Sequence, residues 1–128
     1  MSMTGSNVLL DSSVWINYFL GVDERTKEYV ETDKYILFCS SISIFEVKKK
    51  FLKNGSTESD AFRALGLMKE RCVVIDAGEE ICEKSASDSV RHNLHFADSI
   101  IYRTALEHNA QLVTMDSHFK GLDGVDLI

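Results

Sequence analysis

An uninterrupted aliphatic run at residues 8–10 (VLL) limits the folds that this sequence can adopt. The run does not alternate with polar residues, which is typical of a strand buried on both faces of a parallel sheet. Ser12 or Ser13 then offers an N-cap for the amphipathic helix that follows. Asp11 is therefore expected at the carboxyl end of a buried strand, where open α/β sheets bind ligands. A simple turn or cap role for Asp11 is the alternative.

The rest of the chain alternates short apolar strands with helices and has no Asn-Gly hairpin signal. This alternation predicts an α/β fold with a parallel sheet of four to five strands, covered by helices on both sides. Further strands are expected at residues 35–39, 72–75, 111–115 and 125–128. Helices are expected at about 14–20, 23–31, 44–54, 58–71, 78–92 and 96–109.

The composition is that of an ordinary globular chain, with 45% hydrophobic and 27% charged residues among 128. Residues 1–6 have no periodicity and are expected to be a flexible leader, which leaves residues 7–128 as a single domain. No apolar run approaches the roughly 20 residues of a membrane span, and no secretion signal is evident, so a cytoplasmic location is expected. The three cysteines form no C-x-x-C pair, which argues against a zinc knuckle or a disulfide framework.

The formal net charge of −6 gives no basic footprint of the kind that many nucleic-acid-binding proteins carry. Clustered carboxylates that hold a divalent cation would nevertheless make the formal charge more negative than that of the loaded site. Asp116 supports such a cluster, because it follows an apolar strand as Asp11 does. If the two strands are neighbours, the two carboxylates repel each other, and a divalent cation with oxygen ligands is the simplest way to neutralise them.

Asp98 lies on the same helix face as the apolar residues Ile101, Tyr102 and Ala105. A carboxylate on a buried stripe costs several kcal/mol unless it meets a cation or coordinates a metal. We interpret Asp98 as a residue of the first helical turn that points into a cleft at the edge of the sheet. The alternative is an acid that is favoured at the helix N-terminus by the helix dipole.

Glu46 and the lysines that follow it are less informative. The helical pattern places Glu46 opposite an expected apolar stripe of Ile44, Phe45, Phe51 and Leu52, which favours a solvated glutamate, although it could also face an open cleft. Lys48, Lys49, Lys50 and Lys53 form either a solvated helix face or an edge that grips phosphates. His92 and His95 are interpreted as loop or cap residues, and Asp76 as a turn residue because Gly78 follows closely.

Three stretches together resemble the PIN-domain family and, within it, the VapC-type toxin ribonucleases: VLLDSSVWINYF, ISIFEVKK and HFADSIIYRTALEHNAQLVTMDSHFKGLDGVDLI. The resemblance covers nearly the whole chain from Asn7 onward. Its most specific part is the pattern T-x-D-x-x-F-x-x-L-x-G-V, which is met by Thr114, Asp116, Phe119, Leu122, Gly124 and Val125.

The resemblance implies a PIN-like three-layer α/β/α sandwich and a metal-dependent endoribonuclease, the toxin of a toxin–antitoxin pair. It puts Asp11, Glu46, Asp98 and Asp116 at the four acidic positions of the family. Asp11, Asp98 and Asp116 would hold Mg²⁺ or Mn²⁺, and Glu46 would orient the attacking water. Ser13 and Thr114 fall on supporting polar positions. If the run of lysines after Glu46 grips phosphates, Lys48 and Lys49 are the residues expected to contact the RNA substrate. Many relatives carry one more acid where this chain has His118.

The family further implies a homodimer and an antitoxin protein that plugs the acidic cleft. A PIN-like module that binds RNA or protein without cleavage and a solitary RNA-processing nuclease are the alternatives. Two other folds that place aspartate after a strand fit less well. A haloacid-dehalogenase phosphatase needs an acid at position 13, where this chain has serine, and a receiver domain needs a lysine after a late strand, which residues 114–116 (TMD) do not supply.

Overall fold

Five parallel strands form the central sheet of the computed structural model, which describes residues 6–128. The strands are β1 (Asn7–Leu10), β2 (Ile36–Ser40), β3 (Val73–Ile75), β4 (Gln111–Thr114) and β5 (Val125–Leu127). Their order across the sheet is β3-β2-β1-β4-β5, and every neighbouring pair is parallel. The predicted sheet of four to five strands is confirmed. The predicted leader, residues 1–6, lies outside the described residues apart from Ser6.

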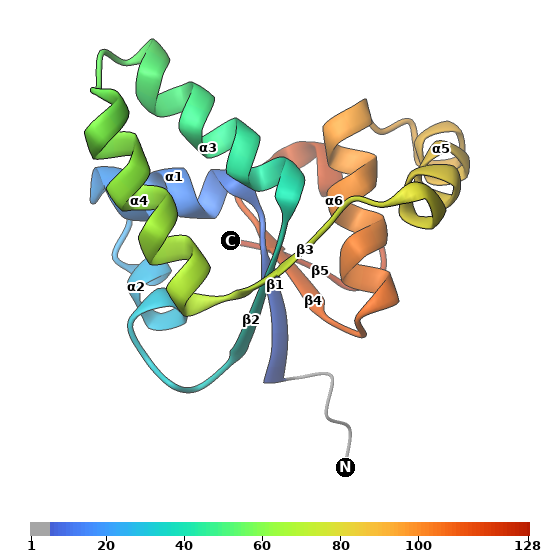
Figure 1. Cartoon of the computed structure of the whole chain (residues 1–128). Helices are drawn as coiled ribbons and strands as arrows, with labels where there is room; N and C mark the ends of the chain where they lie inside the picture. Colours follow the sequence, from blue (N-terminus) through green and yellow to red (C-terminus); the bar gives the residue numbers. More distant parts are fainter. Residues whose placement is uncertain (1–5) are drawn as a thin grey trace.

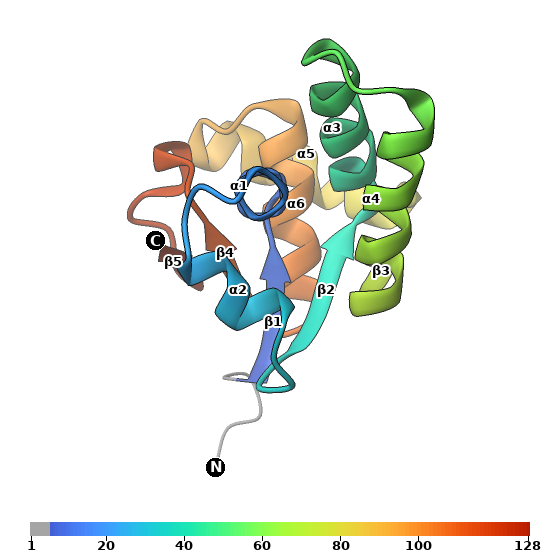
Figure 2. The same ribbon diagram turned by 90° about the vertical axis from the view of Figure 1, so that its left-hand side faces the viewer.

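Helices cover both faces of the sheet and make it the middle layer of a three-layer sandwich (Figure 1; Figure 2). One face carries α1 (Ser12–Leu20), α2 (Arg25–Val30), α3 (Ser41–Lys53) and α4 (Glu58–Arg71). The other carries α5 (Glu79–His92) and α6 (Phe96–Glu107), and the short 3₁₀ helix η2 (Ser117–Phe119) follows β4. No helix within residues 6–128 is long and apolar enough to cross a bilayer.

The central strand β1 is buried on both faces, as its uninterrupted aliphatic run predicted. Val8 and Leu10 pack into the cluster under α1, α3 and α4, whereas Leu9 packs into the cluster under α6. Successive side chains of a strand point to opposite faces, so each aliphatic residue of the run serves one of the two cores. Both cores therefore hold β1 in place and, with it, the residue at its carboxyl end.

Asp11 and Thr114 come together because β1 and β4 are neighbours. Leu10 pairs with Val113, and the Asp11 backbone N–H donates to the Val113 carbonyl over 3.0 Å. The carboxyl ends of β1 and β2 point toward the top of Figure 1, where α1, α3 and α6 all begin. This edge is where open α/β sheets place their ligand sites.

The start of α1 differs from the prediction in a way that matters for the site. Asp11, not Ser12 or Ser13, occupies the N-cap position, and its side chain makes no capping hydrogen bond. The prediction of a serine cap was wrong because both hydroxyls donate to carboxylates instead: Ser12 to Glu46 and Ser13 to Asp11. The Asp11 carboxylate is thereby left facing the edge of the sheet rather than folding back onto the helix.

The apolar face of α3 also differs from the expected stripe. Val47 is fully buried, and the partly buried Ile44 and Phe51 pack beside it, so the residues that face the core are spaced i, i+3, i+7. Phe45 and Leu52, which the pattern assigned to the same stripe, are 64% and 37% exposed. The sequence pattern could not separate these choices because aliphatic and aromatic residues occupy two adjacent faces of the helix. The rotated face turns Glu46 toward α1.

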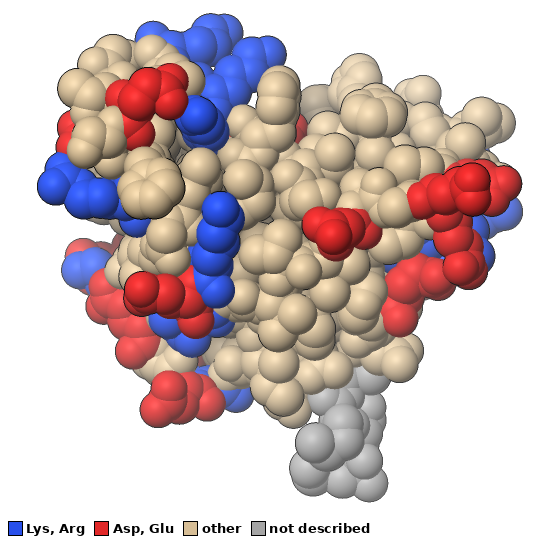
Figure 3. Space-filling model, viewed as in Figure 1, with Lys and Arg blue, Asp and Glu red and all other residues tan. Residues whose placement is uncertain are grey.

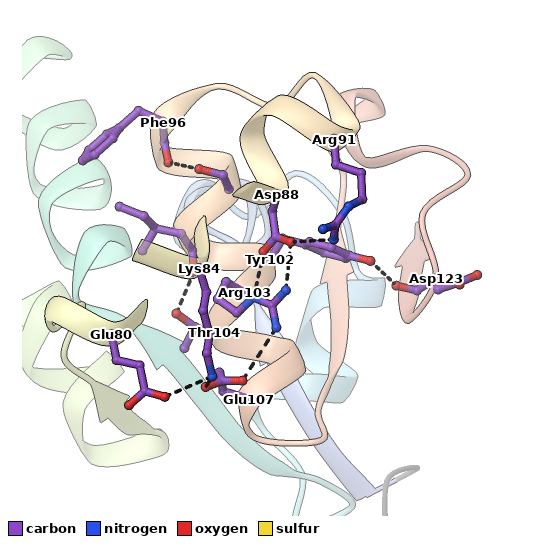
Figure 4. A network of polar contacts seen from close by, with 12 residues as sticks. Glu80, Lys84, Asp88, Arg91, Phe96, Tyr102, Arg103, Thr104, Glu107 and Asp123 are labelled. Carbon is purple, nitrogen blue, oxygen red and sulfur yellow. Dashed lines mark hydrogen bonds and ion pairs between the residues drawn. The ribbon is translucent and has the colours of Figure 1, made fainter. Parts of the chain in front are cut away.

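A polar network fastens α5 to α6 (Figure 4). Asp88 on α5 is 1% exposed and accepts hydrogen bonds from Nε and Nη2 of Arg103 on α6, over 2.7 and 2.8 Å. Lys84 reaches Glu107 over 3.0 Å at the other end of the contact. Tyr102 donates from its hydroxyl to the Asp123 carbonyl over 3.0 Å. These bonds fix the position of α6, which carries Asp98.

Candidate metal centre

Asp11 is a nearly buried carboxylate, 3% exposed, at the carboxyl end of β1. Its Oδ2 accepts hydrogen bonds from Ser13 Oγ over 2.7 Å and from Thr114 Oγ1 over 2.8 Å. Burial raises the pKa of Asp11, and the charge of Asp116 adds to the rise, while the hydrogen bonds from Ser13 and Thr114 oppose it. The two hydroxyls therefore stabilise the charged form of an acid that burial disfavours.

Ser13 and Thr114 also link this carboxylate to the chain around Asp116. The Ser13 Oγ accepts a hydrogen bond from the Met115 backbone N–H over 3.0 Å, and Thr114 Oγ1 accepts one from the Asp116 N–H over 2.9 Å. The two hydroxyl oxygens lie 3.4 Å apart. The hydroxyls of Ser13 and Thr114 thus bridge the Asp11 carboxylate, after β1, and the backbone of residues 115 and 116, after β4.

Glu46 extends from α3 toward the same edge. Its Oε1 accepts a hydrogen bond from Ser12 Oγ over 2.7 Å, and the same hydroxyl lies 3.5 Å from Asp11 Oδ1. Burial raises the pKa of Glu46, the charges of Asp11 and Asp116 raise it further, and Lys49 lowers it. The solvated glutamate that the helical pattern favoured is not what the structure shows. Glu46 instead lies near Asp11 and Asp116 at this edge of the sheet, in what we call the acidic cleft.

Asp98 lies in the first turn of α6, with a side chain that is 14% exposed. The residues that share its helix face, Ile101, Tyr102 and Ala105, are buried as predicted. Burial raises the pKa of Asp98 to about 6, and the charges of Asp116, Asp11 and Glu46 contribute to this rise. Within residues 6–128 its ion-pair partner is His118. The neighbouring carboxylates thus make the charged form of Asp98 costly.

Asp116 caps η2, because its Oδ1 accepts a hydrogen bond from the His118 backbone N–H over 2.9 Å. The His118 ring then turns back toward the acids, with Nδ1 3.2 Å from Asp116 Oδ1 and 3.6 Å from Asp98 Oδ2. One donor atom from each of Asp98, Asp116 and His118 lies within 4.8 Å of the other two. Sequence reasoning did not include His118 among the candidate ligands. The signal was its position two residues after Asp116.

The four predicted acids come from four separate elements and meet at one edge of the sheet, where they act electrostatically on one another. Carboxylate oxygens are the ligands that Mg²⁺ and Mn²⁺ prefer. Mutually repelling carboxylates that are partly removed from water are best neutralised by a divalent cation. Among the described residues, the donor atoms that lie within 4.8 Å of one another belong to Asp98, Asp116 and His118, and this set fits such an ion, whereas Asp11 and Glu46 are not in it.

The lysines of α3 divide between two environments. Lys49, Lys50 and Lys53 line a hollow of about 290 Å³ that also includes Ser12 and Glu46. Lys48 instead forms an ion pair with Glu58 of α4 over 3.0 Å. Figure 3 shows basic side chains gathered over the end of α3, at the top of the molecule. A basic edge thus lies beside the acidic residues. Lys49 interacts electrostatically with Glu46 and lowers its pKa, whereas Lys48 is paired with Glu58.

Three other residues that sequence reasoning considered are outside the cluster. Asp76 is exposed in a turn in which its carbonyl accepts from the Gly78 N–H over 2.9 Å, as interpreted. His92 ends α5 and its ring contacts that of Tyr102 edge-on. His95 takes the N-cap position of α6, and its ring contacts that of His118, with the centroids 5.3 Å apart.

Comparisons with known proteins agree with this architecture. The family model of the PIN domain matches residues 8–125. A toxin–antitoxin complex from Klebsiella pneumoniae contains a chain that is 26% identical, with a TM-score of 0.76 and coverage of 93% of this chain and 95% of that chain. VapBC2 from Rickettsia felis, bound to a DNA fragment from its promoter, gives 17% identity and a TM-score of 0.75 over 95% and 97% of the two chains.

A third structure with the same fold is Mycobacterium tuberculosis VapC20, a toxin that cleaves the sarcin–ricin loop. It is 17% identical, with a TM-score of 0.71 and coverage of 91% of this chain and 92% of that chain. At this level of identity the likeness to VapC20 and to the Rickettsia protein concerns the fold alone. No curated protein sequence matches the chain significantly.

Proposed function

This chain belongs to the PIN domain family, and on that premise we propose that it is a Mg²⁺- or Mn²⁺-dependent endoribonuclease that serves as the toxin of a toxin–antitoxin pair. The observation that carries the proposal is that Asp11, Glu46 and Asp116 act electrostatically on Asp98 at one edge of the sheet, although the four acids lie up to 105 positions apart in the sequence. Neighbouring carboxylates raise the pKa of Asp11, Glu46 and Asp98, so the charged forms of these partly buried acids destabilise the fold unless a cation neutralises them.

Each residue has a defined role in the proposed reaction. Asp11, Asp98 and Asp116 hold the divalent ion, which when bound supplies positive charge to the scissile phosphate and lowers the pKa of water. Glu46 orients the attacking water and accepts its proton, for which its raised pKa is suited. Ser13 and Thr114 keep Asp11 charged and in position. Lys49 contacts the RNA backbone beside the cleft.

The proposed partners are an antitoxin protein and a second copy of the chain. The proposal of an antitoxin is supported by the relative from Klebsiella pneumoniae, whose structure is a toxin–antitoxin complex. An antitoxin that inserts a basic side chain into the acidic cleft would neutralise the carboxylates in place of the ion. Co-purification with the product of the adjacent reading frame, and loss of cleavage in that complex, test this part of the proposal.

The nuclease activity is tested with end-labelled RNA and purified protein in Mg²⁺, in Mn²⁺ and in EDTA. Wild-type protein is expected to cleave only with metal. Asp11→Asn and Asp98→Asn should fold and lose at least about 100-fold in rate, because each loses a metal ligand. Asp76→Asn is the matched control, an aspartate that also follows a strand but lies outside the cluster. Full activity in both cluster variants would remove Asp11 and Asp98 from the mechanism, and RNA binding without cleavage would favour a non-cleaving module.

A further inference from the structure

We propose that His118 is a nitrogen ligand of the divalent ion, together with Asp98 and Asp116, and that it makes the centre favour Mn²⁺ over Mg²⁺. The inference rests on the proposed nuclease function, because it concerns the metal which that function requires. It departs from a centre of carboxylates alone, since the His118 imidazole lies against the carboxylates of both Asp98 and Asp116.

The distances around the imidazole suit a shared ion. Two atoms that are each about 2.1 Å from one ion lie about 3.0 Å apart at an octahedral angle and about 3.4 Å apart at a tetrahedral angle. His118 Nδ1 lies 3.2 Å from Asp116 Oδ1 and 3.6 Å from Asp98 Oδ2. Small side-chain adjustments therefore place one ion within bonding distance of an atom from each residue.

A hydrogen bond explains this placement less well than a shared ion does. The 3.6 Å separation from Asp98 is too long for a hydrogen bond, and the 3.2 Å separation from Asp116 is at the upper end of the usual range. The imidazole nitrogen thus faces two carboxylates from different elements without forming a short bond to either.

The backbone holds His118 at this point even though its side chain is 59% exposed. The residue lies in η2, which Asp116 caps and which the fully buried Phe119 anchors to the core under α6. An exposed histidine on a free loop would have many orientations, whereas here the turn itself directs the ring toward the acids. The arrangement resembles a ligand positioned before the ion arrives.

The identity of the donor atom determines which metal is favoured. Mg²⁺ binds mainly to oxygen, whereas imidazole nitrogen adds affinity for first-row transition metals, including Mn²⁺. The ring of a second histidine, His95, packs against that of His118, but within residues 6–128 His95 is not part of the cluster of donor atoms. His95 therefore provides a matched control for a substitution of His118.

The test is pulsed electron paramagnetic resonance of Mn²⁺ bound to the full-length protein, which detects ¹⁴N coupling from a directly bound imidazole. We expect the coupling in wild type and in His95→Asn, and its loss in His118→Asn. Isothermal titration with Mn²⁺ and with Mg²⁺ should show that His118→Asn loses at least about tenfold in affinity for Mn²⁺ and little for Mg²⁺. His118→Asp should regain affinity for Mg²⁺, because it restores an oxygen ligand.

The outcomes separate this inference from the nuclease proposal. Bound Mn²⁺ without ¹⁴N coupling in wild type, or coupling that persists in His118→Asn, overturns the nitrogen ligand and leaves the nuclease proposal standing. Loss of coupling in His95→Asn, with retention in His118→Asn, would identify His95 as the nitrogen ligand and would also overturn the inference about His118. Failure of wild type to bind Mn²⁺ or Mg²⁺, with RNA cleavage in EDTA, overturns both.

Discussion

Ser12 donates a hydrogen bond from Oγ to Oε1 of Glu46 over 2.7 Å, so the first residue of α1 fixes a carboxylate that belongs to α3. This bond lowers the pKa of Glu46, whereas burial and the charges of Asp11 and Asp116 raise it. The hydroxyl therefore helps to keep Glu46 ionised beside other carboxylates, in the form that can accept a proton from water.

Ser12→Ala should shift the acidic limb of the cleavage rate profile to higher pH. Without the hydrogen bond the pKa of Glu46 rises further, so less of the residue is ionised in mildly acidic solution. At a pH well below the pKa of Glu46, we expect the rate relative to that at pH 8 to fall by up to about fivefold, which corresponds to a hydrogen bond of about 1 kcal/mol. Initial rates over pH 5–9 measure this, with Ser87→Ala on the exposed side of α5 as the control. An unchanged profile in Ser12→Ala would contradict the assigned role.

Asp98→Asn should stabilise the metal-free protein in neutral solution. The pKa of Asp98 is raised from 3.8 to about 6, so the folded state holds this proton more tightly than the unfolded state. The free energy of unfolding of wild type therefore falls as pH rises from about 4 to about 6, and the loss persists above that range. The variant lacks this loss and should be more stable by roughly 1–2 kcal/mol at pH 7.5, after allowance for solvent screening.

Urea unfolding in EDTA at several pH values between 3.5 and 7.5 measures this difference. The stability advantage of Asp98→Asn over wild type should shrink toward pH 4, where the wild-type carboxyl is protonated in both states. A constant difference across the range would mean that Asp98 is not the titrating group.

Mn²⁺ should raise the melting temperature of wild type and not that of Asp116→Asn. An ion that binds only the folded state stabilises it by mass action, which at a hundredfold excess over the dissociation constant gives about 2.7 kcal/mol. For a chain of this size the expected shift is about 5–10 °C. Differential scanning fluorimetry measures the shift, and Asp126→Asn, an exposed aspartate of β5, should respond as wild type does. Equal shifts in wild type and Asp116→Asn would count against the site.

Asp88→Asn should destabilise the fold without a direct effect on the cleft. The substitution removes the buried carboxylate that accepts two hydrogen bonds from Arg103 and leaves this guanidinium with Glu107 at 3.7 Å. Removing one partner of a buried ion pair leaves the other charge poorly compensated, so the free energy of unfolding should fall by roughly 2–4 kcal/mol. Urea unfolding tests this against Glu83→Gln, an exposed acid on the same helix. A loss no larger than that of Glu83→Gln would mean that the network does not fasten α5 to α6.

The sequence by itself determined the strands and helices of the fold. It also placed Asp11 and Asp116 at the carboxyl ends of strands and Asp98 in the first turn of a helix. Burial patterns along a strand or helix are local, so residues 8–10 and 111–114 could be read as buried strands, and the resemblance to the PIN domain supplied their arrangement. The apolar residues that share a helix face with Asp98 likewise indicated that its carboxylate lies next to a buried surface.

Only the tertiary structure decided how the two serines after β1, Glu46 and His118 contribute. Local rules favoured a serine cap and a solvated glutamate, yet Ser12 and Glu46 bond to each other across 34 positions. The side of a partly apolar helix that faces the core depends on which neighbours pack against it, and here Val47 rather than Phe45 is buried. The direction of the His118 ring depends in the same way on the turn after β4 and on the neighbouring α6. Such contacts arise only when strands and helices distant in the sequence are packed together, so no local pattern specifies them.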